Sequence, residues 1–361
     1  MMSGTLFSPW AMGGAYMDVA RHTARLFNCP DHQDGAGIPA SDTLLHCLQS
    51  VDVKNLTLSL MDHVSIFFNP VLMGPRVDGD YLPAEPEVLM AEGRHKITDI
   101  ISGVTADEGG LLALPLYNSE ELRFDLVNNF TEKGPASLDI CEGDADPVQL
   151  SQEIFDFYLG GVTVEKEDAD KICQLYGDRH FNLGHDLVSA LYARNAAHKR
   201  TFMYSLDHRG QRSLRQFYDA DVGQNWVSHV DDLFYFFTGG TSVFSPLERH
   251  EDLRLRDILT KLWVNFATSG NPTPDNSLGF TWQPAAAANL QHLSLTLKPS
   301  MKNDTRKEVR AFWETLPTRQ NFLLHPDKVV PFAREDHGGS RNPEGPAVIK
   351  RLRKYRLLDE L

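Results

Sequence analysis

The chain has 361 residues, 42% of them hydrophobic, which is enough for one large or two small hydrophobic cores. Its net charge of −14 argues against a nucleic-acid partner, because phosphate binding needs a basic surface. No run approaches about 18 consecutive apolar residues, so no transmembrane segment is expected.

The first hundred residues favour short helices joined by loops. Apolar residues recur at helical spacing from Met17 to Phe27. Ser41 or Asp42 is expected to open a second helix that carries Leu44, Leu45 and Leu48 along one face. Four prolines between residues 55 and 86 then break any long helix.

A short apolar run from Ile97 to Val104 predicts a buried parallel strand, and the sequence TADEGG follows it directly. Catalytic groups of open α/β sheets collect beyond the carboxyl ends of strands. Glu108 is therefore a candidate for chemistry. The alternative is a solvated turn carboxylate or a helix cap.

The segment Glu120–His198 is predicted to be mainly helical, and Pro147 is expected to open a helix that buries Leu150, Ile154 and Phe157. A strand is predicted for Thr201–Leu206 and is followed by the charged sequence Asp-His-Arg. A later helix, Leu253–Ser269, is stopped by Gly270 and Pro272.

His229 ends a loop ahead of an aromatic run in QNWVSHVDDLFYFFTGG. Because the ordinary pKa of histidine is about 6.5, His229 can take and return a proton near neutral pH. Alternatively it only caps a helix that Leu233, Phe236 and Phe237 begin. A strand-end Glu followed far downstream by a loop His is the order of the last two members of an α/β-hydrolase triad.

The chain resembles the type-B carboxylesterase and cholinesterase family from Met1 to about Pro317. GVTADEGG looks like the family's acid motif and VSHVDDLFYFF like its histidine motif. Four further segments match in order: SGTLFSPWA at 3–11, PRVDGDYLPAEP at 75–86, TFMYSLDHRG at 201–210 and LWVNFATSGNPTP at 262–274.

The resemblance implies an α/β-hydrolase fold, but only its C-terminal portion, with the last strands of the sheet and the cap-like and C-terminal helices. The family's nucleophilic serine lies in a G-x-S-x-G turn just upstream of the SGTLFSPWA segment, and no G-x-S-x-G occurs in these 361 residues. The glycine-rich oxyanion loop is also absent. Residues 1–318 are expected to be part of the catalytic domain, and residues 319–361 a partly flexible extension.

The implied activity is hydrolysis of a small carboxylic ester by a Ser-Glu-His triad without a metal or organic cofactor. Glu108 takes the acid role and His229 the base role, and the chain is expected to be inactive alone for lack of the serine. The family match assigns the cluster at Asp207, His208 and Arg209 a structural role. The alternative is a neuroligin-like extracellular adhesion protein that keeps the fold without catalysis.

Other roles follow from the same resemblance. Trp10 is a substrate-pocket candidate, with a core-packing role as the alternative. Cys29 and Cys47 match the family's disulfide, which implies secretion or the endoplasmic-reticulum lumen. Cys141 and Cys173 have no assigned partner and are either free thiols or paired outside the chain. Asn-x-Ser/Thr sequons that predict glycosylation are at Asn55, Asn129 and Asn303.

The predictions for the C-terminal end rest on its amino-acid composition. Asp336–Pro346 is predicted to be a flexible linker, and a basic stretch follows it. The final Leu-Asp-Glu-Leu resembles an endoplasmic-reticulum retrieval signal but lacks its usual basic residue.

Overall fold

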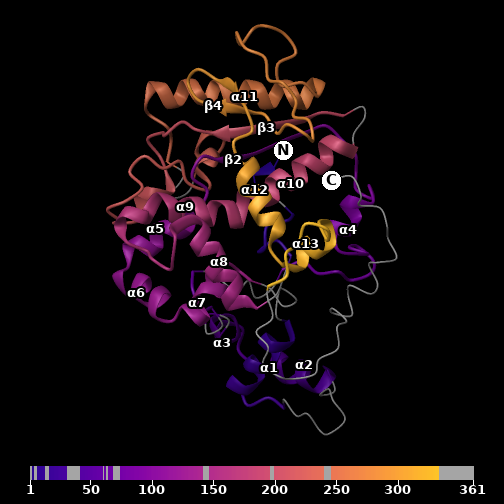
Figure 1. Ribbon diagram of the computed structural model, residues 1–361, viewed down its shortest axis with the longest axis vertical. Helices are drawn as coiled ribbons and strands as arrows, with labels where there is room; N and C mark the ends of the chain where they lie inside the picture. Colours follow the sequence, from indigo (N-terminus) through magenta and orange to yellow (C-terminus); the bar gives the residue numbers. More distant parts are fainter. Residues whose placement is uncertain are drawn as a thin grey trace.

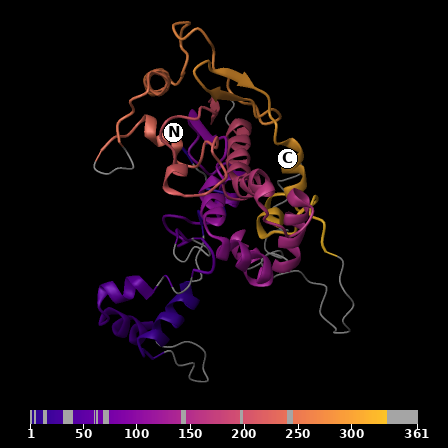
Figure 2. The ribbon, with the colours of Figure 1, turned by 90° about the vertical axis from the view of Figure 1, so that its left-hand side faces the viewer.

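The computed structural model describes residues 2–3, 6–12, 16–30, 41–59, 61, 64–67, 74–140, 146–195, 199–239 and 245–332 (Figure 1). A mixed sheet lies near one end of the molecule, with helices on both faces, and a small helical lobe lies at the other end (Figures 1 and 2). No helix among these residues is long and apolar enough to cross a bilayer.

The sheet has five strands in the order β1-β2-β3-β4-β5. The first four strands are parallel and β5 is antiparallel to β4. Their bounds are β1 Met2–Ser3, β2 Ile100–Thr105, β3 Thr201–Leu206, β4 His292–Leu295 and β5 Ser300–Lys302. The sequence did not predict β4 and β5.

β2 and β3 pair along their whole length, from Ile100 opposite Thr201 to Thr105 opposite Leu206. The predicted strand began earlier, at Ile97. The observed strand begins later, at Ile100, because the Arg200 N–H is taken by the carboxylate of Asp99 (2.7 Å). In a longer strand, that N–H would donate to a backbone carbonyl and continue the hydrogen bonding between β2 and β3. Since the two strands end together, the loops that follow them start at one edge of the sheet.

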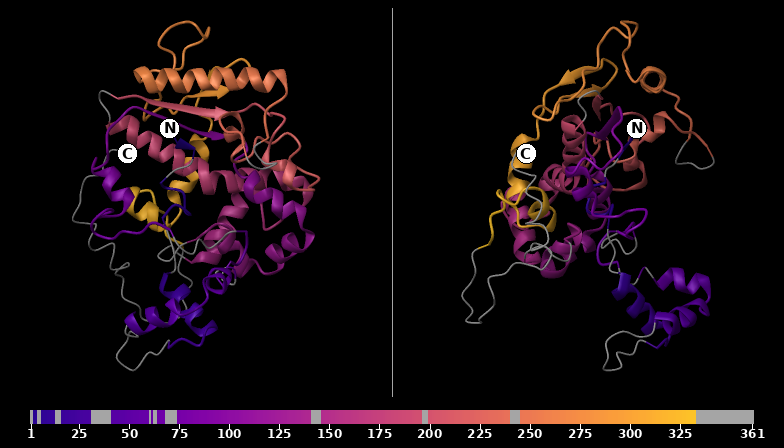
Figure 3. Two further views of the ribbon diagram at one scale, coloured as in Figure 1. Left: turned by 180° about the vertical axis from the view of Figure 1, so that it is seen from behind. Right: turned by 90° about the vertical axis from the view of Figure 1, so that its right-hand side faces the viewer.

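One face of the sheet packs on α11 (His250–Ser269), which crosses it in Figure 1. Alternation along β3 points Phe202, Tyr204 and Leu206 to the same side, where they share a core with Leu255 and Leu259 of α11. α10 (Leu183–Asn195) also contacts β2 and β3 and lies on the other side of the sheet in Figure 3.

The remaining helices form a layer below the sheet and the separate lobe. They are α1 Tyr16–Leu26, α2 Ser41–Gln49, α3 Val53–Leu58, α4 Pro86–Ala91, α5 Gly110–Asn118, α6 Glu120–Asn128, α7 Phe130–Ser137, α8 Pro147–Leu159, α9 Ala169–Gly177, α12 Lys307–Thr315 and α13 Arg319–Leu324. Short turns η2 Lys166–Asp168, η3 Asp178–Asn182, η4 Leu214–Phe217 and η5 Asp231–Tyr235 connect elements.

One prediction about a helix face was wrong. Phe157 of α8 is 45% exposed, whereas Leu150 and Ile154 are buried as expected. Phe157 lies near the helix end and stacks flat on Phe312 of α12 (ring centroids 3.8 Å apart), while Phe155 enters the core. After His229, where a capped helix was the alternative left open, the aromatic run forms the short 3-10 turn η5.

The described part of the extension, residues 319–332, includes α13, which packs on α4. Arg319 pairs with Glu85 (2.6 Å), and the Gln320 amide donates to Glu87 (3.3 Å). The linker predicted for Asp336–Pro346, the basic stretch and the terminal Leu-Asp-Glu-Leu lie outside the described residues.

Candidate active site

The loop that carries Glu108 begins where β2 ends and leads into α5. Glu108 is only 4% exposed. Its Oε1 accepts the backbone N–H of Thr105 (2.7 Å), which fixes the carboxylate over the strand end. Its second oxygen, Oε2, is left for another partner.

That partner is His229, whose Nδ1 lies 2.6 Å from Glu108 Oε2. The two residues are 121 positions apart in the sequence. Asp107 joins their loops, because its N–H donates to the Val227 carbonyl (2.9 Å) and its carboxylate accepts the Val227 N–H (2.8 Å). The structure therefore brings together the two residues that the sequence singled out.

The electrostatics of the pair favour a charged histidine. Burial alone lowers the pKa of His229, but the hydrogen bond and the charge of Glu108 outweigh it, with smaller contributions from Asp232 and Asp231, so the pKa is raised above 6.5. Since Glu108 accepts the proton on Nδ1, Nε2 is the nitrogen that remains to exchange a proton with another group.

The chain turns sharply after His229. Val230 adopts the left-handed conformation (φ 70°), which costs a β-branched residue about 1–3 kcal/mol. Asp231 holds the turn by accepting the N–H groups of Ser228 (2.9 Å) and Leu214 (2.8 Å). Burial raises the pKa of Asp231 to about 6.

Close backbone packing explains the glycines after Glu108. A Cβ on Gly109 would lie 1.9 Å from the Cys173 carbonyl oxygen of α9, and one on Gly110 would lie 2.4 Å from Ser228 Oγ. No other residue fits at Gly109, because the obstructing atom belongs to the backbone.

The two cysteines without an assigned partner are placed differently. Cys173 is a buried free thiol, and burial raises its pKa. Cys141 lies outside the described residues.

One aromatic ring lies against the histidine, and a second lies behind the first. The Phe181 ring stacks on the His229 imidazole, with centroids 4.4 Å apart and an angle of 28° between planes. Trp10, the predicted pocket residue, is half-buried and lies behind Phe181 at 5.9 Å. Phe181 is not predictable from the sequence, because one aromatic residue within a helical pattern gives no distinguishing signal.

The Asp-His-Arg cluster after β3 contacts the protein's own framework. His208 Nε2 lies 2.8 Å from the carboxylate of Asp252, which also accepts the Gln211 N–H (2.9 Å). Asp207 accepts hydroxyl hydrogen bonds from Ser205 and from Ser294 of β4. These contacts attach the loop after β3 to α11 and to the neighbouring strand.

The remaining predicted residues are placed as follows. Cys29 and Cys47 form the expected disulfide, which joins the end of α1 to α2. The sequon residues Asn55, Asn129 and Asn303 are all exposed. Within the described ranges, no group of three or more His, Cys, Asp or Glu side chains is placed to hold a metal ion.

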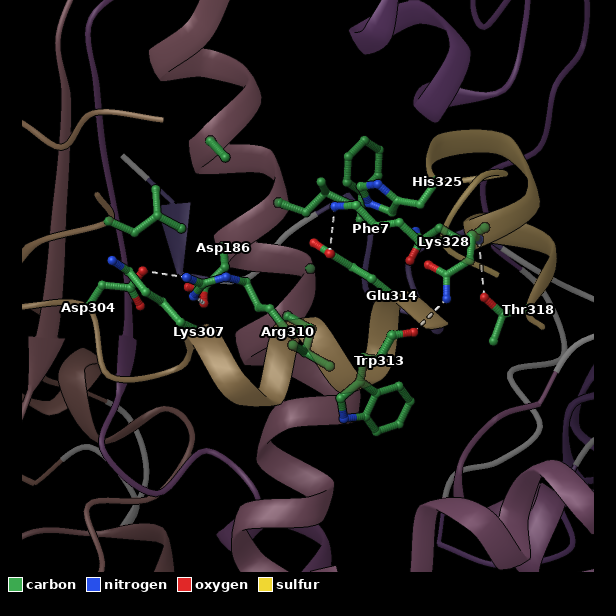
Figure 4. A pocket seen from close by; sticks show the side chains of 18 of the residues that line it. Phe7, Asp186, Asp304, Lys307, Arg310, Trp313, Glu314, Thr318, His325 and Lys328 are labelled. Carbon is green, nitrogen blue, oxygen red and sulfur yellow. Dashed lines mark hydrogen bonds and ion pairs between the residues drawn. The ribbon is translucent and has the colours of Figure 1, made fainter. Parts of the chain in front are cut away.

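A cavity of about 410 Å³ lies apart from the pair, between α10, α12 and α13 (Figure 4). Neither Glu108 nor His229 lines it. Most of its charged side chains pair with one another, as Lys328 does with Glu314 (2.8 Å). The labelled lining residues are Phe7, Asp186, Asp304, Lys307, Arg310, Trp313, Glu314, Thr318, His325 and Lys328.

A parallel sheet that presents a carboxylate and a histidine on loops beyond its strand ends is typical of α/β-hydrolases. Comparison with known proteins identifies the family. The chain belongs to the carboxylesterase family, whose model matches residues 1–313. This confirms the family predicted from the ordered motifs.

Individual relatives agree with the family match. The chain is 28% identical to juvenile hormone esterase of Tribolium castaneum, over 77% of this chain and 49% of the relative. It is 24% identical to venom carboxylesterase-6 of Apis mellifera (89% and 58%) and 25% identical to bile salt-activated lipase of Homo sapiens (86% and 40%). The chain thus spans about half the length of these curated relatives.

Proposed function

We propose that this chain contributes the acid, Glu108, and the base, His229, of a Ser-Glu-His triad in a carboxylic ester hydrolase. The observation that carries the proposal is the 2.6 Å contact between these two residues, which come from separate loops. Both side chains lie in segments, GVTADEGG and VSHVDDLFYFF, that resemble the family's acid and histidine motifs. The substrate class is a small carboxylic ester, in line with the names of the relatives.

The chemistry is acyl transfer to a serine. His229 takes the serine proton through Nε2 and later delivers it to the departing alcohol. Glu108 keeps the other proton on Nδ1 and stabilises the imidazolium that forms, in agreement with the raised pKa of His229. Water then repeats the attack on the acyl-enzyme, and backbone N–H groups bind the oxyanion.

The serine is proposed to lie in a segment that precedes Met1 in a longer polypeptide, here called the extended protein. Two observations support this: no G-x-S-x-G occurs in the sequence, and the relatives are about twice as long as the matched part. The 361 residues alone then have no esterase activity. We assign residues 1–318 to the catalytic domain and residues 319–361 to an extension.

The disulfide and the exposed sequons favour an extracellular or endoplasmic-reticulum location. A neuroligin-like adhesion protein is the competing function. The close Glu108–His229 pair favours an enzyme, because a serine triad needs its acid in direct contact with its base.

The coding sequence directly upstream of Met1 tests the proposal. A G-x-S-x-G turn there, together with hydrolysis of a simple aryl ester by the extended protein, is the expected result. A different residue in place of the serine would support the adhesion function instead. An extended protein that carries the serine but hydrolyses no ester would contradict the proposal.

A further inference from the structure

We propose that Phe181 is a positioning residue for His229: its ring lies against one face of the imidazole and fixes the plane in which Nδ1 meets Glu108. The inference rests on the proposed function, since it concerns the base of the same triad. It assigns a role to a residue that no motif marks.

The contact between the two rings carries the argument. The Phe181 ring is nearly parallel to the imidazole, at 28°, and its centroid is 4.4 Å away. The outer torsion of a histidine side chain is broad, so one hydrogen bond from Nδ1 restrains it incompletely. A ring in van der Waals contact blocks rotation towards that face and excludes water from it. Phe181 is itself 3% exposed.

Phe181 reaches this position because the chain forms a π-helical turn, η3, between α9 and α10. The N–H of Leu183 bonds to the carbonyl of Asp178, five residues earlier, instead of four. The inserted residue rotates the side chains of η3 relative to those of α10. α10 itself still packs on β2 and β3. π-turns are rare and occur often at functional sites.

Contacts that involve neither Glu108 nor His229 hold the π-turn in place. The guanidinium of Arg179 donates to the carbonyls of Leu138 (2.7 Å) and Asp139 (2.9 Å). His180 Nε2 donates to the Ser137 carbonyl (3.0 Å), and burial followed by the charge of Arg179 lowers the pKa of His180 to about 3, so that it stays neutral. These hydrogen bonds therefore fix the position of the turn and of the Phe181 ring that it carries.

Trp10 supports Phe181 from behind. Its indole N–H donates to the carbonyl of His180 (2.8 Å), the residue next to Phe181. Its ring is tilted at 53° to the Phe181 ring, with centroids 5.9 Å apart. Movement of Phe181 away from the imidazole would require this second ring to move too.

The experiment compares Phe181→Leu and Phe181→Tyr with the matched control Phe155→Leu, which alters a buried phenylalanine of the core beside α9. In the extended protein, Phe181→Leu should lower kcat by up to about 100-fold with KM little changed, because the base is misplaced. Phe181→Tyr keeps the ring and should retain most of kcat. Phe155→Leu should lower stability without lowering kcat.

A spectroscopic readout separates positioning from general destabilisation. With histidine ring labelling, and His229 assigned by its loss in His229→Gln, the imidazole C–H protons should be shifted upfield by the Phe181 ring current. They should move downfield in Phe181→Leu and stay in place in Phe155→Leu. Unshifted protons in the unmutated protein overturn the proposal even if no variant folds.

The two proposals fail in distinguishable ways. An extended protein without esterase activity contradicts the proposed function but leaves the ring-current test standing. An active extended protein in which Phe181→Leu keeps both kcat and the imidazole shifts contradicts the role of Phe181 alone.

Discussion

Two buried carboxylates in this protein meet basic partners in different ways. Glu108 contacts the imidazole of His229, on a loop beyond the strand ends. Asp186, on α10, accepts from the guanidinium groups of Arg306 (3.0 Å) and Arg310 (2.6 Å) beside the cavity of Figure 4. Both carboxylates are less than 5% exposed, so burial alone does not distinguish them.

The difference lies in the partner. Burial by itself raises the pKa of Asp186, but the charge of Arg306 and hydrogen bonds outweigh it and hold the pKa well below the ordinary range. Because arginine stays protonated, this pair can exchange no proton and only holds α10 to the region of α12. A histidine can both take up and release a proton, and His229 keeps one ring nitrogen available for this. A titratable partner, more than burial, therefore distinguishes a candidate catalytic carboxylate from a structural one.

The largest effect is expected at His229. In the extended protein, His229→Ala should reduce kcat for an aryl ester about a millionfold, because removing the base of such a triad leaves the serine unactivated. The thermal unfolding midpoint should change little. Steady-state kinetics and a thermal scan give the two values, and near-normal turnover would remove His229 from the mechanism.

Glu108→Gln should reduce kcat about 10⁴-fold, because the imidazole loses the anion that sets its tautomer. It should also shift the acid limb of the kcat/KM profile to lower pH. The sign follows from the structure: Glu108 raises the pKa of His229 and burial lowers it, so without the Glu108 charge the base stays neutral in more acidic solution. An acid limb that moves to higher pH would contradict this account of the pair.

Asp186→Asn should lower the stability of the fold and leave the catalytic rate unchanged. It removes the buried carboxylate that Arg306 and Arg310 share, and within the described residues only Arg310 keeps a second one, Asp304, so the free energy of unfolding should fall by about 3 kcal/mol. The value is at the low end for buried pairs because both guanidinium groups keep some solvent contact. Urea titration measures the loss, and kcat per folded molecule should match the unmutated protein. A selective loss of kcat would show that the cavity region takes part in catalysis.

His208→Ala is expected to have the smallest effect. Like His229, His208 contacts a buried carboxylate, at 2.8 Å, but its loop only ties β3 to α11. Loss of one hydrogen bond to Asp252 should lower the free energy of unfolding by about 1–3 kcal/mol. Esterase turnover should stay unchanged, which makes this variant the histidine control for His229→Ala. A loss of turnover as large as that of His229→Ala would erase the distinction between the two histidines.

Motifs led the sequence to candidate site residues, whereas local patterns left part of the fold unpredicted. The GVTADEGG and VSHVDD segments pointed to Glu108 and His229, because each carries a chemical group at a loop position that the family match identifies. Phe181 could not be predicted, since its position depends on one inserted residue in a π-turn. β4 and β5 were missed because strands of four and three residues show too little alternation to detect.

Helix faces were predictable only where the helix packs along its whole length. On α11, the buried residues Leu255, Leu259 and Leu262 recur at helical spacing along the face that packs on the sheet. The last turn of α8 does not, because Phe157 pairs with Phe312 of α12, a partner 155 residues further along that local periodicity cannot reveal.

Fluorophosphonate labelling of the 361-residue chain and the extended protein, mapped by mass spectrometry, tests the central claim most directly. The account predicts no covalent label on any residue of the 361-residue chain. It predicts one label on the extended protein, on a serine upstream of Met1, and loss of that label in His229→Ala. Specific labelling of a residue within the 361 would contradict the claim that this chain holds only the acid and the base. So would upstream labelling that is independent of His229.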